Sequence, residues 1–482
     1  MSRPFPDHAF LRNGWKPWPM EGEIADLVVE GEIPRELHGT LYRNGPNQQY
    51  APRGAYHPFS GDGMIHAFQI AGGRAAYRNR WVRTPRFELE RAAGESLFAG
   101  FGNFKDNDPR TQGVPGGPAN TNVVWHAGKL LALVEGGLPP VRLDPQTLET
   151  LGIDDFGGKL RRKVAPEIAR ELGIDAPDGL VPGTFTAHPK LDPETDEMLA
   201  FGYSAIPPYL QYYVVSAQGE LVRTEEIEIP FPAMVHDFIT TKQHVIFPIF
   251  PATLRIERAG QGRDVLGWEP ELGTQIGVMP RGGTGRDVRW FQTNASFVFH
   301  PLNAYTSGRR IVADMAQYPR LPIPADGNAG LFEQNVTASL VRWTIDLDGG
   351  VVKEEPLDSR PIEFPRLDER RTGLENRWGY AASGEQIARG FQSVVRYDLR
   401  SGACTEHPLE AGSACGEPIF VPRRPDSPEG EGFLLAVVYR EAERRSDLLV
   451  LDAENLAQAP LATVQLPHRV PFGFHGNWRQ ER

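Results

Sequence analysis

Cysteine is nearly absent from this chain, which has only Cys404 and Cys415 among 482 residues. Two thiols cannot build the disulfide framework of a small secreted fold. So few cysteines are typical of proteins that stay in a reducing compartment. We therefore expect a cytoplasmic location.

Long apolar runs and a basic leader are also missing. No stretch approaches the roughly 18 apolar residues of a membrane-spanning helix. The N-terminus does not join a basic start to an apolar run, so we expect no signal peptide. The sequence thus predicts a soluble protein whose contact with membranes is at most peripheral.

Positive charge is the third scarce feature. The formal net charge is −11, and the basic residues are not clustered. Binding to nucleic acids depends largely on neutralising phosphates with Lys and Arg. We therefore expect no nucleic-acid partner.

Turn-forming residues, in contrast, are abundant, with 51 Gly and 43 Pro. They separate short β-rich runs, a pattern that favours an all-β fold. Pairs of such runs joined by short polar turns predict hairpins. The predicted hairpins are 65–70 with 75–82, 123–126 with 130–135, 212–216 with 221–229, 238–240 with 245–249, 297–305 with 311–315, 340–345 with 351–354, 394–397 with 404–407, and 433–439 with 448–451.

Helical periodicity is scarce, and the one helix that we predict spans 164–172, with Pro166 near its start and Gly173 after it. A radial array of antiparallel sheets would leave few exposed edges and would gather strand ends around one axis. We predict an irregular arm over 1–24 and a single β-propeller domain over 25–482. A pair of β-sandwiches is the alternative.

Four histidines lie between apolar residues, where a solvated imidazole is unexpected: His188, His236, His300 and His475. They are 48, 64 and 175 residues apart, so they come from separate hairpins that could converge. Neutral imidazole suits zinc, copper, iron and nickel, and iron(II) with open positions suits O₂ chemistry. We predict that the four share one metal. The alternative is a core role, which we expect of His8, His38, His57, His66, His126, His244, His407 and His468.

Three glutamates, Glu135, Glu363 and Glu417, lie in apolar or turn contexts where a solvated charge is unexpected. A buried carboxylate needs a partner. Metal-bound histidine commonly donates its other ring N–H to a carboxylate, which fixes the tautomer. These glutamates are therefore candidates to hold the metal-binding histidines. The alternative is that they are solvated residues at strand ends.

A series of short motifs runs along the chain in a characteristic order. They are GTLYRNGP at 39–46, FSGDGMI at 59–65, TAHP at 186–189, HDF at 236–238, FH at 299–300, EFP at 363–365, EPIFV at 417–421 and HG at 475–476. In this order they resemble the carotenoid cleavage oxygenases, a family of non-haem iron enzymes, from about residue 31 to residue 478. The resemblance implies a seven-bladed propeller with a loop-rich, partly helical cap over the iron.

The resemblance also implies roles for the site residues. Fe(II) would be bound by His188, His236, His300 and His475. The last three would be held by Glu135, Glu363 and Glu417 respectively, and His188 would have no carboxylate. Thr121 would place its methyl group beside an open iron position, and Phe59 would line the substrate pocket. The implied reaction is O₂-dependent cleavage of an alkene into two carbonyl compounds, without an organic cofactor.

The implied partners are O₂ and a small lipophilic or aromatic alkene. Family members that cleave phenolic stilbenes and phenylpropenes carry a Tyr and a Lys that bind the 4-hydroxyl group. Phe101 and Val134 stand at the matching positions here. We therefore expect an apocarotenoid substrate, with a phenolic stilbene or phenylpropene as the alternative. A polyene-binding or isomerase relative without oxygenase activity is a further alternative.

Overall fold

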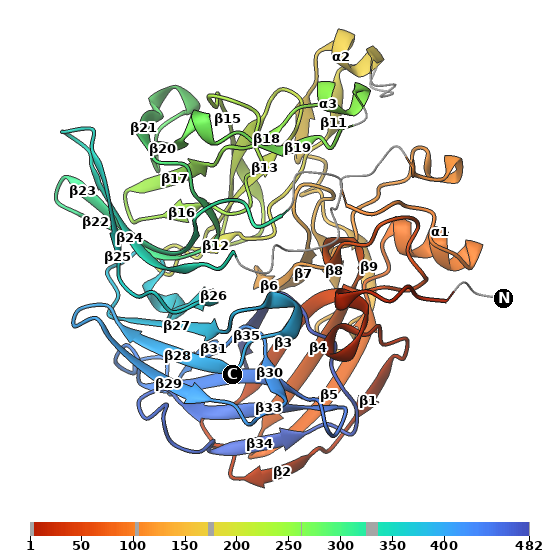
Figure 1. The fold of residues 1–482 in the computed structure, drawn as a ribbon, viewed down its shortest axis with the longest axis vertical. Coiled ribbons are helices and arrows are strands. Elements are labelled where there is room, and N and C mark those ends of the chain that lie inside the picture. Colours follow the sequence, from red (N-terminus) through yellow and green to blue (C-terminus); the bar gives the residue numbers. More distant parts are fainter. Residues whose placement is uncertain (1–3, 102–105, 172–177, 262, 324–335, 482) are drawn as a thin grey trace.

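The computed structural model describes residues 4–101, 106–171, 178–261, 263–323 and 336–481. Seven antiparallel sheets of four to six strands are arranged around a common axis (Figure 1). The predicted seven-bladed β-propeller is therefore confirmed, and the alternative of two β-sandwiches is wrong. Each of the predicted hairpins forms between adjacent antiparallel strands of one sheet.

Four blades are meanders of consecutive strands. They are β6 (Asn122–His126), β7 (Lys129–Leu133), β8 (Val141–Leu143) and β9 (Thr150–Ile153); β12 (Lys190–Leu191), β13 (Met198–Tyr203), β14 (Leu210–Val215) and β15 (Leu221–Ile227); β22 (Phe297–Ser307), β23 (Arg310–Tyr318), β24 (Ser339–Asp346) and β25 (Val352–Pro356); and β26 (Ile362–Arg366), β27 (Trp378–Ser383), β28 (Ser393–Asp398) and β29 (Ala403–Pro408). In each meander the polar turns let neighbouring apolar runs pair directly.

A fifth blade contains an insertion. It consists of β16 (Ile239–Thr240), β17 (His244–Ile249), β20 (Thr274–Pro280) and β21 (Arg289–Thr293). Between β17 and β20 the chain forms a separate hairpin of β18 (Ala252–Leu254) and β19 (Leu266–Trp268).

The remaining two blades combine the two ends of the chain. One has the order β1 (Gly22–Ile24), β5 (Arg74–Trp81), β4 (Asp62–Ala71), β3 (Gly39–Asn47) and β35 (Gly476–Gln480). The other has the order β2 (Val28–Gly31), β34 (Ala462–Gln465), β33 (Arg445–Asp452), β32 (Gly432–Arg440) and β30 (Ser413–Cys415), with β31 (Ile419–Pro422) also on β32. Two seams, the pairing of β3 with β35 and the pairing of β2 with β34, join the two ends of the chain and close the ring. Closure protects strand edges that would otherwise be open for pairing. The strand β1 lies at the end of the predicted arm.

Helices are short and lie in connections between strands. Among the described residues the α-helices are α1 (Pro85–Ala93), α2 (Pro166–Glu171) and α3 (Glu257–Gly260). The predicted helix over 164–172 forms as α2, although residue 172 lies outside the described residues. In Figure 1, α2 and α3 lie together near β11 (Leu180–Pro182), which pairs with β10 (Arg161–Lys163). No helix among the described residues is long and apolar enough to span a membrane.

Helix α1 was not predicted, although its ends carry recognisable signals. The Thr84 hydroxyl accepts a hydrogen bond from Phe87 N at 3.1 Å, which caps the N-terminus. Pro85 occupies the first turn, where its missing N–H is not needed. Gly94 ends the helix in the left-handed region, with φ of 73°. The helix was missed because its apolar face is narrow.

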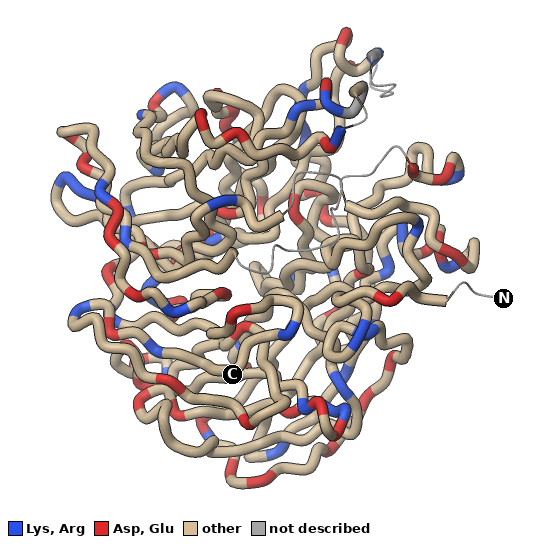
Figure 2. Tube along the Cα trace, in the orientation of Figure 1, with Lys and Arg blue, Asp and Glu red and all other residues tan. Residues whose placement is uncertain are grey.

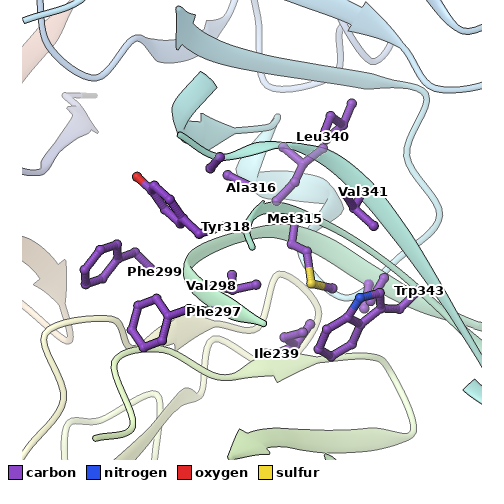
Figure 3. Packing of buried hydrophobic residues seen from close by; sticks show 14 of the residues in the cluster. Ile239, Phe297, Val298, Phe299, Met315, Ala316, Tyr318, Leu340, Val341 and Trp343 are labelled. Carbon is purple, nitrogen blue, oxygen red and sulfur yellow. The ribbon is translucent and has the colours of Figure 1, made fainter. Parts of the chain in front are cut away.

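The largest apolar cluster fills the space between neighbouring blades. It includes Val298 of β22, Met315 of β23 and Trp343 of β24, all almost fully buried (Figure 3). Full burial of such side chains stabilises the fold by roughly 1.5–3 kcal/mol each. The cluster also includes Phe299, whose ring lies 4.9 Å from the ring of His236. The cluster therefore extends inward to one of the four histidines. In Figure 2, acidic and basic residues are interspersed along the outer strands and loops.

Candidate metal centre

The innermost strands deliver the four histidines to the axis. His188 lies just before β12, His236 just before β16, and His475 immediately before β35. His300 lies within β22, where the register with β23 shifts between Val298 and Pro301. Such a bulge turns a side chain away from the regular alternation. Inner strands of different blades contact one another, among them β16 with β22 and β35 with β6.

The four imidazoles meet at one point. Nε2 of His236 lies 3.1 Å from Nε2 of His188 and 3.3 Å from Nε2 of His300. His188, His300 and His475 bring one ligand atom each within 4.8 Å of one another. A cavity of about 360 Å³ reaches these three histidines along the inner strands. The structure therefore brings together all four histidines named from the sequence.

Three of the histidines are held by the three glutamates. Nδ1 of His236 bonds to Glu135. Nδ1 of His300 lies 2.6 Å from Glu363 Oε2, and Nδ1 of His475 lies 2.9 Å from Glu417 Oε1. Because a carboxylate only accepts, each Nδ1 carries the proton and each neutral ring leaves its Nε2 bare. The pairing matches the one implied by the resemblance.

The centre favours a positive charge. The bare Nε2 lone pairs of His236 and His300 face each other at 3.3 Å and repel unless a cation lies between them. Burial lowers the pKa of His236, but the carboxylates of Glu135, Asp237 and Glu363 outweigh it and raise the pKa. Four imidazole donors of this kind fit zinc, copper, iron or nickel.

Two tyrosines and an arginine, none of them predicted, hold the carboxylates in turn. The hydroxyl of Tyr203 donates to Glu135, and the hydroxyl of Tyr318 donates to Glu363 Oε1 at 2.8 Å. Arg366 Nη1 donates to Glu417 Oε1 at 3.2 Å. These partners come from strands far away in the sequence, so spacing gave no signal for them.

The acidities of two glutamates follow from these contacts. Burial opposes ionisation of Glu417, but Arg366 and His475 outweigh it and lower its pKa to about 2. Burial likewise opposes ionisation of Glu363. The His300 ring and the Phe364 N–H outweigh that effect, so the pKa of Glu363 is below its ordinary value. Both side chains are therefore carboxylates at neutral pH.

His188 is held differently. Its Nδ1 lies 3.9 Å from Asp237 Oδ2, too far for a hydrogen bond, and Asp237 pairs with Lys190 Nζ at 2.8 Å. The backbone N–H of His188 donates to Thr186 Oγ1 at 2.8 Å. This arrangement agrees with the implied lack of a directly bonded carboxylate.

Phe364 is a further residue that the sequence did not reveal. Its backbone has φ of 53°, a left-handed conformation that is rare for a bulky residue. Its N–H donates to Glu363 Oε2 at 2.6 Å, and its ring lies 5.2 Å from the rings of both His300 and His475. Backbone strain of this kind is commonly found at functional sites.

The proposed pocket residues lie in two groups. The rings of Phe59 and Phe101 are 5.4 Å apart, and Phe59 is 5.7 Å from Phe474, the neighbour of His475. Val134, which precedes Glu135, packs instead into an apolar cluster with Leu138. Phe59 and Phe101 thus form an aromatic wall that contacts Phe474, whereas Val134 is buried in a separate apolar cluster.

Thr121 lies immediately before β6, and its carbonyl accepts the N–H of His475 at 3.2 Å. Several histidines left outside the site have partners elsewhere. His66 Nδ1 bonds to the Tyr77 hydroxyl at 2.7 Å, and His407 Nδ1 donates to the Leu456 carbonyl at 3.1 Å. These contacts are those of core residues.

Known proteins resemble the chain over its whole length. Residues 15–480 match the family described as retinal pigment epithelial membrane protein. Isoeugenol monooxygenase of Pseudomonas putida is 38% identical, with 96% of each chain covered. Carotenoid cleavage oxygenase of Mycobacterium tuberculosis is 34% identical, with 97% of each chain covered. The crystal structure of Pseudomonas brassicacearum lignostilbene dioxygenase has a TM-score of 0.90 at 34% identity and covers 100% of both chains.

Proposed function

We propose that this chain, which belongs to the retinal pigment epithelial membrane protein family of carotenoid cleavage oxygenases, cleaves a conjugated carbon–carbon double bond with O₂ to give two carbonyl products. The family resemblance drawn from the motifs is thereby confirmed. The observation that carries the proposal is the convergence of four imidazoles, three of them backed by glutamates, on one point of the propeller axis.

We assign Fe(II) to this point, bound by His188, His236, His300 and His475. When bound, iron supplies open positions at which O₂ can react with the alkene. Four neutral ligands leave its full charge uncompensated, and Glu135, Glu363 and Glu417 balance it from outside the ligand set. They also fix each Nδ1–H and so aim each Nε2. Thr121 is assigned to the neighbourhood of an open position.

For the substrate we propose an apocarotenoid. Phe101 is half-buried, with the ring of Phe59 at 5.4 Å and the ring of His57 at 5.3 Å. An aromatic wall packs well against a polyene, and Phe101 offers no hydroxyl group to a phenol. Val134 adds a second apolar side chain where phenol-cleaving relatives carry a lysine.

A phenylpropene or stilbene is the second candidate. It is supported by the 38% identity to isoeugenol monooxygenase and by the TM-score of 0.90 to lignostilbene dioxygenase. The identity to isoeugenol monooxygenase exceeds the 34% identity to the carotenoid cleavage oxygenase of Mycobacterium tuberculosis. Recognition of a phenol would then depend on residues other than Phe101 and Val134.

The test is aerobic incubation of iron-loaded protein with a panel of apocarotenals, hydroxystilbenes and isoeugenol, followed by mass spectrometry of the products. O₂ consumption with appearance of aldehydes supports the oxygenase. A polyene-binding or isomerase relative would consume no O₂ and would return the substrate uncleaved or isomerised.

We also propose that residues 25–482 act as one catalytic unit and that the enzyme works in the cytoplasm. Cys404 and Cys415 are both free thiols, which supports a reducing compartment. O₂ and the alkene are its proposed partners.

The three glutamates give a prediction of moderate size. We expect Glu135→Gln, Glu363→Gln and Glu417→Gln each to lower iron affinity or turnover by roughly 10- to 100-fold, because an amide binds Nδ1–H more weakly than a carboxylate does. Iron content after dialysis and kcat measure the effect. The matched control is Glu354→Gln, a partly buried glutamate that holds Gln317 at 2.9 Å on another part of the propeller. Wild-type iron affinity and turnover in all three variants would show that these glutamates do not support metal binding.

A further inference from the structure

A buried ion cluster lies beside the aromatic wall and has no part in metal binding. Arg86 of α1 places its Nε 3.8 Å from Asp62 Oδ1 and 3.7 Å from Glu90 Oε2. Arg86 is 5% exposed, and Asp62 and Glu90 are fully buried. One guanidinium therefore faces two carboxylates away from solvent.

Such a cluster is a poor way to stabilise a fold. Burying charges costs several kcal/mol per ion, and apolar residues of similar volume often serve stability equally well. Burial raises the pKa of Asp62 to about 7, with Arg86 opposing the shift and Glu90 reinforcing it. The function of the cluster must therefore be sought in the segments that it holds.

The ion cluster is hydrogen-bonded to both segments of the aromatic wall, the one that contains Phe59 and the one that contains Phe101. Glu90 Oε1 accepts the backbone N–H groups of Leu97 at 2.7 Å and Phe98 at 2.9 Å. Arg86 Nη2 donates to the Ser60 carbonyl at 2.8 Å. Ser60 Oγ in turn accepts the backbone N–H of Phe101 at 2.8 Å. Helix α1 thus fixes the backbone that follows Phe59 and the backbone that leads into Phe101.

The same network continues to the metal centre. Asn120 Nδ2 donates to the carbonyls of Phe59 at 2.9 Å and Gly61 at 2.6 Å. Thr121 Oγ1 donates to Asn120 Oδ1 at 3.0 Å. The Thr121 carbonyl accepts the N–H of His475 at 3.2 Å. Polar contacts therefore run from α1, through the wall, to the backbone of a proposed iron ligand.

We infer that Arg86 and Glu90 are positioning residues that determine substrate selectivity, because they set where Phe59 and Phe101 stand relative to the four histidines. The inference rests on the proposed function and deepens it. A displacement of about 1 Å in a pocket wall can change reactivity 100-fold, and its effect differs between ligands of different shape. Loss of the contacts that Arg86 and Glu90 make should therefore change the preference between substrates, in addition to any general loss of stability.

The test measures binding in the absence of O₂. Two probes, trans-4-hydroxystilbene and β-apo-8′-carotenal, are titrated against the iron-loaded wild type and its variants. The readout is the ratio of the two Kd values. We expect this ratio to change at least 10-fold in Glu90→Ala, which leaves the N–H groups of Leu97 and Phe98 without their acceptor. Glu90→Gln keeps an oxygen acceptor and should return the ratio to within about 3-fold of wild type.

The matched control is Arg342→Met. Arg342 forms a comparable ion pair with the buried Asp314, at 2.7 and 2.8 Å, between β24 and β23. We expect this variant to lower Tm and to leave the Kd ratio within about 2-fold of wild type, because the pair holds no wall segment. If Glu90→Ala does not fold, the Kd ratio of Arg86→Lys is measured in its place. Lysine cannot reproduce the guanidinium contacts, and we expect a change of at least about 3-fold.

An unchanged Kd ratio in the folded variants, an equal change in the Arg342→Met control, or a wild type that binds neither probe would overturn the inference. The outcome is separate from that of the proposed function. The Kd ratio could change as expected in a protein that neither consumes O₂ nor releases aldehydes. That result would refute the proposed oxygenase activity and would support the positioning role of Arg86 and Glu90.

Discussion

Replacing His475 by alanine will remove iron from the protein and abolish alkene cleavage. The wild type should hold about one iron per chain, as expected of a single site. The four histidines proposed as its ligands approach one point, with Nε2 atoms as close as 3.1 Å. Loss of one ligand opens this site to water. It also removes the imidazole partner of Glu417, which then keeps only the contact with Arg366 Nη1 at 3.2 Å and the backbone N–H of residue 476. We expect iron content below about 10% of wild type and kcat/KM lower by at least about 1,000-fold.

Metal analysis after anaerobic loading and gel filtration measures the first quantity, and product formation measures the second. The control is His407→Ala, which removes a buried imidazole bonded to the Leu456 carbonyl far from the centre. It should lower stability and keep the iron. Because the metal binds the folded state, adding Fe(II) should also raise the Tm of the wild type and the control, but not that of His475→Ala. Full iron content and activity in His475→Ala would falsify the assignment.

The second large effect concerns substrate preference. The double change Phe101→Tyr with Val134→Lys should raise kcat/KM for 4-hydroxystilbenes and lower it for apocarotenals. Burying a phenol hydroxyl without a partner costs on the order of 1–3 kcal/mol, or roughly 5- to 150-fold in binding. The new hydroxyl and ammonium groups would offer partners to the phenol. The same buried ammonium would have no partner opposite a polyene.

The measurement is kcat/KM for both substrate classes on both proteins, since discrimination is a ratio of these values. Phe101→Leu is the control, because it changes the wall without adding a polar group. Efficient cleavage of hydroxystilbenes or isoeugenol by the wild type, with apocarotenals left intact, would show that the apocarotenoid assignment is wrong. The iron assignment would survive that result, because it depends on the histidines.

Sequence reasoning went furthest where local pattern decides structure. The hairpins were predictable because short apolar runs and polar turns specify them within about 20 residues of chain. The histidines and glutamates stood out because each interrupts an apolar stretch, but only the family motifs selected these four from twelve histidines.

What the sequence missed depends on distant contacts. Tyr203 and Tyr318 look like ordinary strand residues until the fold brings their hydroxyls to Glu135 and Glu363. Arg366 lies 51 positions from Glu417 along the chain. Helix α1 lacked a strong apolar period, and its buried Arg86 and Glu90 are held by contacts outside the helix, with Ser60 and with the segment at 97–98, rather than by helical amphipathicity.

The seam between β35 and β3 ties metal binding to the order in which the protein is synthesised. His475 immediately precedes β35, which pairs with β3 near the other end of the chain. On the ribosome, His188, His236 and His300 emerge well before His475, so a nascent chain can present only three of the four proposed ligands. If the four histidines bind iron as proposed, the complete set comes together when β35 pairs with β3, and tight iron retention would report that the whole ring has been assembled.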